Sequence, residues 1–376
     1  MIRDVEKPTS EAGLPLLDKL KLLNFRCFHH LELNVPEGLS LFTGQNASGK
    51  TTLLEAISYI STGKLLRSHR DRDAVRSDET HCEVSGILSP SQTEISIQIP
   101  EVGKKVASIN KMSLPKASDL LGRLPTTSIT AFDLPLSQGD PASRRMFLDL
   151  EIGALQPSYV HKLAIYKRAL EQRNSLLKMA MQTVIDQDQF EAWEFAMAES
   201  GSYVRQQRQV YFAKLAPLAS STYQEIAKKE ILSLFLKEEE GGLDTESLQQ
   251  AFALSRSHDM RRGSTSLGPH RDDFGMEIDG KDVKNYGSQG QQRSVAIALK
   301  AGSFQVSRET SGTPPLLLLD DMLSDLDEYR RTALAALVIN QSRQALLTCT
   351  EASSVSNHIV SRASVLKVSN GEVTWK

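Results

Sequence analysis

The chain has few cysteines and no long hydrophobic run. Only three of its 376 residues are cysteines, and Cys27, Cys82 and Cys349 fit neither paired metal ligands nor a disulfide framework. The longest aliphatic run, Leu316 to Leu319, is far too short to cross a bilayer, and Met1 to Pro15 lacks the apolar stretch of a signal peptide. These absences exclude zinc-site, disulfide-rich and membrane-spanning classes. They predict a cytoplasmic protein, without a membrane partner, whose thiols are buried and reduced.

An excess of charge of one sign is also lacking. Lys and Arg together number 44 and Asp and Glu number 46, which gives a net charge of -2. A globally basic nucleic-acid-binding protein is therefore excluded, and any contact with DNA must come from a local basic face. Hydrophobic residues make up 40% of the chain and charged residues 24%, which is typical of a globular protein.

What the chain does contain is a complete phosphate-binding loop. It lies between an apolar run at Leu39 to Thr43, which predicts a buried strand, and residues Thr52 to Ile60, which predict a helix. Small residues let backbone amides close around phosphate groups, and the helix that follows adds the positive end of its dipole. The predicted nucleotide-binding residues are Gly44, Gln45, Asn46, Ala47, Ser48, Gly49, Lys50 and Thr51.

A second segment supplies carboxylates for the same chemistry. The apolar run Leu316 to Leu319 predicts a strand, and it ends in Asp320 and Asp321. A strand beside a phosphate loop supplies the Asp that orders the metal, so we expect Asp320 and the Thr51 hydroxyl to hold Mg²⁺. We expect Asp321 to act as the general base for the attacking water. In the phosphate loop, Lys50 is the residue expected to bridge the β and γ phosphates.

The remaining pattern divides the chain into lobes. Periodic apolar residues predict helices between about Arg144 and Arg262, interrupted at Pro157 and Pro217. Alternating residues with Asp279-Gly280 at the turn predict a hairpin. Further predicted elements are a helix at Arg293 to Phe304, a helix at Glu328 to Val338 and a strand at Ala345 to Leu347. The predicted domains are a flexible tail at 1–15, the first part of an ATPase lobe at 16–143, a helical lobe at 144–262, and a C-terminal part with the signature motif and Walker B strand at 263–376.

The combination of motifs resembles the ATP-binding-cassette head shared with SMC proteins. It is most similar to the RecF family of recombination-repair ATPases, and the similarity runs from about Leu16 to the C-terminus. The resemblance implies an α/β fold, an ABC-type ATPase head with a mixed β-sheet and an inserted helical lobe. The motifs that carry it, besides the phosphate loop, are Leu23-Asn-Phe-Arg26, Arg144-Arg145-Met-Phe-Leu-Asp149, Arg168-Ala-Leu-Glu-Gln-Arg-Asn174, Gly268-Pro-His-Arg-Asp-Asp273, Ser288-Gln-Gly-Gln-Gln-Arg293 and Ser324-Asp-Leu-Asp327.

The resemblance also implies an ATP-gated homodimer. In such heads the signature loop lies too far from its own phosphate loop to close the site. Ser288 and the Gly290 amide of one protomer would reach the γ-phosphate held by Lys50 of the other, as catalytic residues. ATP would therefore favour the dimer and hydrolysis would release it. Asp325 would lie across the same seam, and Arg26 would stack near adenine, with a plain surface position as the alternative.

Some positions depart from the cassette transporters. Those proteins carry a His after the next strand to contact the γ-phosphate, where this chain offers Thr348 and Thr350. Asp321 is one methylene shorter than the usual Glu, and we expect slow turnover. Gln138 is a candidate for the glutamine loop that reports the nucleotide state, and a solvated loop residue is the alternative.

Clusters of cations give candidate DNA contacts. Such contacts would be to backbone phosphates, insensitive to sequence and weakened by salt, although cations on helices usually form a solvated face. The cluster after the first helix is Lys64, Arg67, Arg70 and Arg72. Further cations that we expect on the surface are Lys162, Lys167, Arg168, Arg173, Lys178, Arg205, Arg208, Arg256, Arg261 and Arg262.

The predicted function is a weak, DNA-stimulated ATPase of recombinational repair and replication restart that uses ATP and Mg²⁺. By resemblance it binds duplex DNA and single-strand/double-strand junctions after DNA damage, in the setting of the SOS response, and helps to load RecA with RecO and RecR. The alternatives are an ABC-type transporter ATPase subunit and a non-catalytic nucleotide-binding scaffold. A switch His is expected of the transporter and is not found here.

Overall fold

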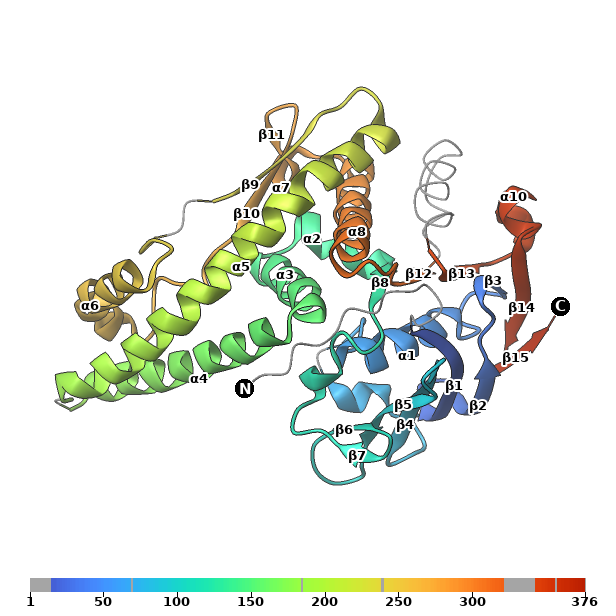
Figure 1. Cartoon of the computed structure of the whole chain (residues 1–376), viewed down its shortest axis with the longest axis horizontal. Helices are drawn as coiled ribbons and strands as arrows, with labels where there is room; N and C mark the ends of the chain where they lie inside the picture. Colours follow the sequence, from blue (N-terminus) through green and yellow to red (C-terminus); the bar gives the residue numbers. More distant parts are fainter. Residues whose placement is uncertain are drawn as a thin grey trace. The chain divides into compact units, whose positions relative to one another are not determined.

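The computed structural model of the chain describes residues 15–68, 70–183, 185–237, 240–320, 342–355 and 357–375 (Figure 1). They form two compact units. Unit 1 consists of Met1–Asp133, Glu225–Lys228 and Ile297–Lys376, and unit 2 of Leu134–Gln224 and Lys229–Ala296. The tail predicted at 1–15 and the helix predicted at 328–338 lie, but for residue 15, outside the described residues. None of the described helices combines the length and apolar content that a bilayer-spanning helix needs.

One sheet of unit 1 is antiparallel and has the order β2-β1-β4-β5-β6-β7. The alternation of apolar and polar residues along its strands matches their side-chain period of two. In β1, for example, Leu20 and Leu22 are buried, while Lys19 and Lys21, which alternate with them, are partly exposed. The strands are β1 (Leu16–Phe25), β2 (Phe28–Asn34), β4 (Cys82–Ser89), β5 (Thr93–Ile99), β6 (Val106–Ile109) and β7 (Met112–Ser113).

The second sheet of unit 1 carries the phosphate loop. Its order is β15-β14-β3-β13-β12-β8, with β14, β3, β13, β12 and β8 parallel and β15 antiparallel at the edge. β12 and β13 are buried along their whole length, as expected for parallel strands covered on both faces. The strands are β3 (Gly38–Thr43), β8 (Thr126–Ile129), β12 (Leu316–Asp320), β13 (Gln344–Cys349), β14 (Ala363–Ser369) and β15 (Glu372–Trp375).

The continuous apolar run of β12 divides between two hydrophobic cores. Leu316 and Leu318 belong to the core that contains helix α1 (Lys50–Thr62), and Leu317 and Leu319 belong to the core that contains Ile297 of helix α8 (Gln289–Ser311). Because successive side chains of a strand point to opposite faces, a strand between two cores has to be apolar at every position. Asp320 therefore comes at the end of a strand that is fixed on both faces.

Unit 2 is mainly helical, with a small antiparallel sheet of order β11-β10-β9. Asp279 and Gly280 both have positive φ, 50° and 76°, which confirms the predicted hairpin between β10 and β11. Its helices and strands are α2 (Pro135–Gln138), α3 (Pro141–Leu155), α4 (Pro157–Ala180), α5 (Gln187–Ala227), β9 (Leu232–Leu236), α6 (Thr245–Arg262), β10 (Phe274–Ile278), β11 (Lys281–Asp282) and α7 (Val283–Tyr286). The ends of α5 and α8 belong to unit 1.

Short helical turns complete the described elements. They are η2 (Asp71–Ala74), η3 (Ala117–Leu120), η4 (Ala131–Asp133), η5 (Ala352–Ser354) and α10 (Asn357–Val360).

Two expectations about single residues need correction. Pro157 begins α4, as predicted, but Pro217 lies inside the 41-residue helix α5 and does not interrupt it. Proline removes one helical hydrogen bond, and burial of the neighbouring Leu215 and Ala219, each 0% exposed, offsets that cost. The thiols are free, but Cys27 is exposed rather than buried.

Candidate functional site

The phosphate loop joins β3 to α1 and leaves no room for side chains at two glycines. A Cβ on Gly44 would lie 2.3 Å from the Val368 carbonyl oxygen, and a Cβ on Gly49 would lie 3.0 Å from Cys27 Sγ. Gly49 also has φ of 110°, and Ala47 has φ of 65°. These positive φ values turn the loop so that successive backbone amides can face an anion. The conformation of the loop backbone is therefore suited to binding an anion such as a phosphate group.

Lys50 lies across this loop. Its Nζ donates hydrogen bonds to the carbonyl oxygens of Gly44, at 2.6 Å, and Gln45, at 2.8 Å. The residue is only 7% exposed. A phosphate oxygen carries negative charge and attracts the ammonium group more strongly than a neutral carbonyl oxygen does, so phosphate oxygens can displace these carbonyls. The predicted role of Lys50 at the β and γ phosphates is compatible with this position and stays a prediction.

The structure brings the two predicted metal-binding residues together. Thr51 Oγ1 donates to Asp320 Oδ1 at 2.9 Å, across 269 positions of sequence. Mg²⁺ usually takes only one or two protein oxygens and fills its other positions with water and phosphate oxygens, which this pair matches. No group of three or more acidic, His or Cys side chains suited to a metal occurs among the residues that the structure describes. The oxygens of Thr51 and Asp320 are therefore suited to hold Mg²⁺, and this role stays a prediction.

Thr348 has a contact that the sequence did not reveal. Its Oγ1 donates to the same Asp320 Oδ1 at 2.8 Å, because β12 and β13 pair in a register that places Asp320 opposite Thr348. The hydroxyl therefore orients the carboxylate. Thr350, the other residue at the position of the switch His, accepts a hydrogen bond from the Gly44 amide through its carbonyl oxygen at 3.2 Å. Asp321 and Asp325 lie outside the described residues, so their predicted roles stay predictions.

Arg26 lies beside the first turns of α1 rather than at a plain surface position. It contacts Glu55 through Nε at 2.5 Å and Nη2 at 2.9 Å, and its Nη1 donates to the Asp73 carbonyl oxygen at 3.0 Å. Its side chain is 19% exposed. The same carboxylate accepts from Arg67. Sequence reasoning missed Glu55, because one acidic residue within an apolar helix gives no signal of its partners.

The signature segment forms the start of α8. Ser288 Oγ accepts from the Gln291 amide at 3.3 Å and Gln291 Oε1 accepts from the Ser288 amide at 2.8 Å, which is a capping box. Gln291 Nε2 also donates to Glu230 Oε1 at 3.0 Å. Ser288 and Gly290 are exposed at the end of a 23-residue helix, so their backbone amides can meet an anion. Glu230 is a supporting residue that sequence reasoning did not find.

Gln138 is joined to the same helix within unit 2. Its Nε2 donates to Gln292 Oε1 at 2.7 Å, and Gln292 Nε2 in turn donates to the carbonyl oxygens of Val283 and Lys284. The solvated-loop alternative for Gln138 is therefore wrong. Its role in sensing the nucleotide stays a prediction.

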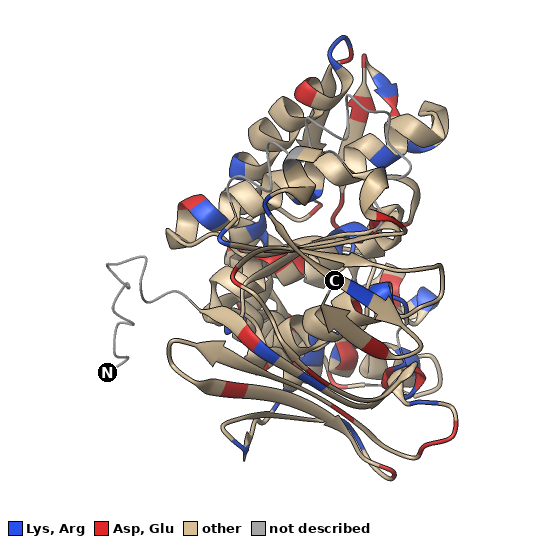
Figure 2. Cartoon of the chain, turned by 90° about the vertical axis from the view of Figure 1, so that its right-hand side faces the viewer, with Lys and Arg blue, Asp and Glu red and all other residues tan. Residues whose placement is uncertain are grey.

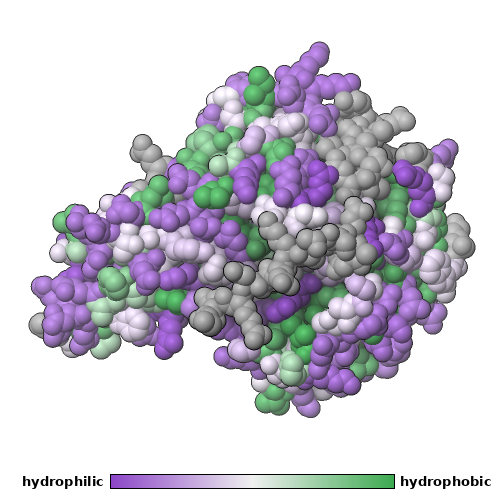
Figure 3. Space-filling model, viewed as in Figure 1, coloured by the Kyte–Doolittle hydropathy of each residue, from purple (hydrophilic) through white to green (hydrophobic). Residues whose placement is uncertain are grey.

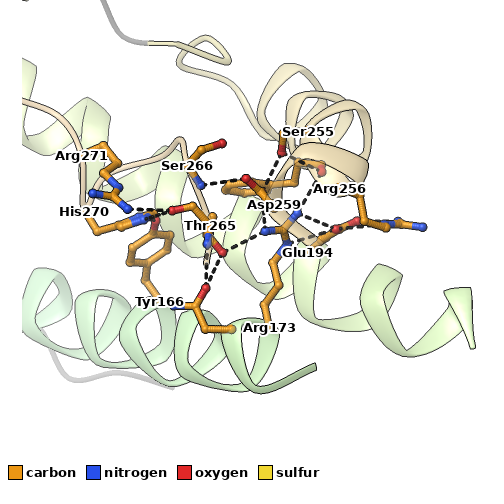
Figure 4. Close-up of polar contacts among 12 residues, drawn as sticks. Tyr166, Arg173, Glu194, Ser255, Arg256, Asp259, Thr265, Ser266, His270 and Arg271 are labelled. Atoms are coloured by element: carbon orange, nitrogen blue, oxygen red, sulfur yellow. Dashed lines mark hydrogen bonds and ion pairs between the residues drawn. The ribbon is translucent and has the colours of Figure 1, made fainter. Parts of the chain in front are cut away.

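Three arginines predicted as surface cations are instead buried in unit 2. Arg173, Arg205 and Arg208 are 0%, 0% and 4% exposed. Arg173 donates to Glu194 and Asp259, as Figure 4 shows, while Arg205 pairs with Asp272 and Arg208 with Asp149. Burying a guanidinium requires carboxylate partners, which helices α3, α5 and α6 and the loop before β10 supply. The expectation that these three contact DNA is wrong.

The segment Gly268–Asp273 is part of the same polar core. Its Asp272 binds Arg205, and its Asp273 accepts from Arg144 at 2.6 and 3.0 Å and from Lys237 at 2.8 Å. Burial raises the pKa of Asp273, but the hydrogen bonds from Arg144 and Lys237 outweigh it and hold that pKa below its usual value. This family motif thus has a structural role in the helical lobe.

His270 in this segment is a neutral residue. Burial, opposed in part by a hydrogen bond to Thr265, lowers its pKa from 6.5 to about 4. Nε2 lies 3.2 Å from the Thr265 carbonyl oxygen and Nδ1 lies 2.6 Å from the Tyr166 hydroxyl, contacts visible in Figure 4. A neutral ring satisfies both, with Nε2 donating and Nδ1 accepting. Protonation would put a second donor against the Tyr166 hydroxyl and the arginines nearby.

The candidate DNA-binding cluster of unit 1 is partly engaged within the chain. Arg67 contacts Glu55, and Arg72 donates to the carbonyl oxygens of Thr80 and Glu101. Lys64 and Arg70 are exposed. Basic and acidic residues are interspersed along the ribbon in Figure 2, and the face in Figure 3 is largely hydrophilic with scattered apolar side chains. DNA binding by the four cations stays a prediction.

The fold and the site together define a class of protein. A phosphate loop between β3 and α1, an aspartate at the end of the parallel strand β12, and a Ser-x-Gly-Gln-Gln segment at the start of α8 are the marks of an ATP-binding ABC-type ATPase head. The Smc head domain of Pyrococcus furiosus, solved with the C-terminal domain of ScpA, shares this fold with a TM-score of 0.55 at 14% identity over 96% of each chain. The predicted fold class is confirmed.

Within this class, the chain belongs to the RecF family. It is 34% identical to the DNA replication and repair protein RecF of Clostridium acetobutylicum over 95% of this chain and 99% of that protein. A solved structure of the recombination mediator protein RecF with ATP, in the RecFOR pathway, has a TM-score of 0.87 and 30% identity over 98% and 99% of the two chains. Residues 19–251 also match a family model described as an AAA domain. The predicted family is confirmed.

Proposed function

We propose that this chain is an ATP-dependent DNA-binding protein of recombinational repair and replication restart. It binds duplex DNA and single-strand/double-strand junctions as an ATP-gated dimer, and it helps to load RecA with RecO and RecR. Its matches over nearly the full chain are to DNA replication and repair proteins, which favours this function over a transporter subunit or a scaffold. The observation that carries the proposal is the 2.9 Å contact between Thr51 and Asp320 at the end of a complete phosphate loop.

The residues divide the work of binding and hydrolysis. The loop amides and Lys50 hold the triphosphate, and Asp321 orients the attacking water. Thr51 and Asp320 would hold Mg²⁺, which shields the charge between phosphate oxygens when bound. The Thr348 hydroxyl keeps the Asp320 carboxylate turned toward Thr51. Hydrolysis is weak and DNA-stimulated, so that the nucleotide serves as a timed switch.

The γ-phosphate is the link between two protomers in this proposal. Ser288 and the Gly290 amide of one protomer contact the nucleotide bound by Lys50 of the other. Their exposure at the start of α8 supports this role, because the helix dipole and open amides attract an anion. Loss of the γ-phosphate removes the contact, so the dimer dissociates after hydrolysis.

The dimer is tested by sedimentation of the full chain with ATP, with ADP and without nucleotide. We expect a dimer only with ATP, and Lys50→Met should remain a monomer under all three conditions. One mass in all three states would overturn the ATP-gated dimer. Adding a short duplex should raise the hydrolysis rate of the wild type, and an unchanged rate would overturn the DNA-stimulated switch.

A mixing experiment tests the shared site. Lys50→Met removes the nucleotide contact of one protomer and Ser288→Ala removes the hydroxyl offered by the other. Each mixed dimer, with one subunit of each variant, should contain one working site. Both substitutions fall in one of its two sites, and the other site keeps Lys50 and Ser288. A mixture as inactive as either variant alone, with ATP-dependent association retained, would contradict the shared site.

A further inference from the structure

One buried carboxylate of unit 1 lies between two arginines that are distant in sequence. Glu55 is on α1, and its side chain is 0% exposed. Its Oε1 accepts from Arg26 Nη2 at 2.9 Å and from the Arg67 amide at 3.2 Å. Its Oε2 lies 2.5 Å from Arg26 Nε and accepts from Arg67 Nε at 3.1 Å and Nη2 at 2.8 Å. Both oxygens are therefore shared by both arginines.

The three charges hold one another in place. A carboxylate buried without partners is strongly unfavourable, and two guanidinium groups brought close together repel each other. Glu55 therefore needs the arginines, and its negative charge offsets the repulsion between Arg26 and Arg67. Movement of either arginine leaves the buried carboxylate with part of its contacts unmade, so the position of one depends on that of the other.

The two arginines come from different segments of unit 1, and Arg67 also donates from Nη2 to Thr52 Oγ1 on α1 at 2.9 Å. Arg26 belongs to the turn between β1 and β2, which abuts the phosphate loop, since a Cβ on Gly49 would lie 3.0 Å from Cys27 Sγ. Arg67 belongs to the segment after α1 and has a 29% exposed side chain. Among the described residues, no hydrogen bond engages its Nη1 group, which leaves donors for a phosphate oxygen.

We propose that Glu55 is a positioning residue that couples a DNA phosphate at Arg67 to the nucleotide beside Arg26. The proposal rests on the proposed function, in which both ligands bind unit 1. A phosphate that draws the guanidinium of Arg67 changes the contacts of Glu55, and with them the position of Arg26. Because such coupling is reciprocal, DNA must change the affinity for ATP by the same factor by which ATP changes the affinity for DNA.

The coupling factor is measured on the full chain with a fluorescent ATP analogue. Its Kd is determined with and without saturating duplex DNA, and the ratio is the factor, which for coupled sites is about 5 to 150. Glu55→Gln keeps the shape of the side chain and removes its charge. We expect the ratio to fall toward one in this variant, and the reciprocal ratio of DNA affinities with and without ATP to fall equally.

Unit 2 offers a matched control. Glu194 is 1% exposed and also lies between two arginines, Arg173 at 3.0 Å and Arg256 at 2.6 Å. Glu194→Gln removes a buried carboxylate of the same kind and should keep the wild-type coupling factor, because Glu194 contacts Arg173 and Arg256 rather than Arg26 or Arg67. Glu55→Asp is the second test variant, since it keeps the charge needed for folding and withdraws it from both guanidinium groups.

The outcomes separate this inference from the proposed function. A wild-type factor above one that persists in folded Glu55→Gln and Glu55→Asp overturns the role of Glu55 and leaves the DNA-stimulated ATPase intact. An equal loss of coupling in Glu194→Gln also overturns it, because the loss would then follow from destabilisation alone. A wild-type factor of one overturns the DNA-coupled switch itself, and the role of Glu55 with it.

Discussion

The phosphate loop of unit 1 and the helical core of unit 2 bury charge in different ways, although Glu55 beside that loop is paired with two arginines. Among the buried charged residues of unit 1, Lys50, Glu55 and Asp320 lie at or beside the phosphate loop. Unit 2 buries Arg173 and several other charged side chains within its helical core, each beside an opposite charge. Lys50 donates to two neutral carbonyl oxygens, whereas Arg173 contacts two carboxylates.

The difference separates two uses of a buried charge. A charge that is already paired with opposite charges contributes to the structure, because removing its partner is costly. A charge that is held only by neutral groups keeps its attraction for a ligand of opposite sign. We therefore expect substitutions in the polar core of unit 2 to lower stability, and substitutions at the phosphate loop of unit 1 to lower activity.

The largest expected effect is on stability. Arg173→Met leaves Asp259 buried without its arginine and Glu194 with Arg256 alone, and it should lower the free energy of unfolding by about 3–5 kcal/mol. Urea unfolding followed by circular dichroism measures this. The control is Lys167→Met on the same helix, whose side chain is 60% exposed. Equal losses in the two variants would remove the distinction between buried and exposed cations.

Lys50→Met should show the opposite pattern. Losing the ammonium group at the phosphates should slow hydrolysis by on the order of 100- to 1,000-fold. Its loss should lower the free energy of unfolding by about 1–3 kcal/mol, less than in Arg173→Met, because two hydrogen bonds to carbonyls are lost and no buried carboxylate is left unpaired. Phosphate release at saturating ATP and thermal unfolding test the two parts. Substantial unfolding of this variant would show that the loop charge is structural after all.

The third prediction concerns pH and His270. Its pKa is lowered in the folded protein, so the stability that it contributes is complete above pH 6.5 and is lost as the pH falls toward about 4. The loss corresponds to roughly 3 kcal/mol. The slope of the free energy of unfolding against pH should become smaller in His270→Gln. It should keep its wild-type value in His161→Gln, because His161 is exposed in the same unit. An unchanged slope in His270→Gln would show that His270 is not the residue responsible.

The smallest expected effect is at an exposed pair of unit 2. Lys162 and Glu199 lie 2.8 Å apart with side chains 30% and 54% exposed. Glu199→Ala should lower the free energy of unfolding by less than about 1 kcal/mol, because water competes for both charges. Urea unfolding of Glu199→Ala and Arg173→Met under the same conditions measures the two losses. A loss as large as that of Arg173→Met would mean that burial does not decide the energy of these pairs.

Local patterns were sufficient for most of the fold. Three features depend only on residues close together in sequence, and the structure confirms the element predicted from each. They are the apolar run before Asp320, the glycines of the phosphate loop and the Asp279-Gly280 turn. The partners of Glu55 could not be read, because Arg26 and Arg67 reach it from outside its helix. The prediction that Pro217 interrupts a helix is wrong, because burial of the neighbouring side chains outweighs the tendency of proline to break a helix.

The cations of the helical lobe show the same limit. Arg173, Arg205 and Arg208 look like surface residues in the sequence, because a charge gives no local sign of whether a carboxylate will meet it. The pairing depends on segments far apart along the chain, and the structure shows all three buried. The contact between Thr348 and Asp320 shows the same limit. The sequence predicts both parallel strands, but their register, which places Thr348 opposite Asp320, is known only from the structure.

The sequence by itself determined the family, the phosphate loop and the strands around it, because these depend on residue type and short-range periodicity. Only the tertiary structure decided which charges are free for a ligand and which are held by partners. The reason is physical: the free energy of a charge depends on its burial and on the groups it meets. Those groups come together across long stretches of chain, as Thr51 and Asp320 do.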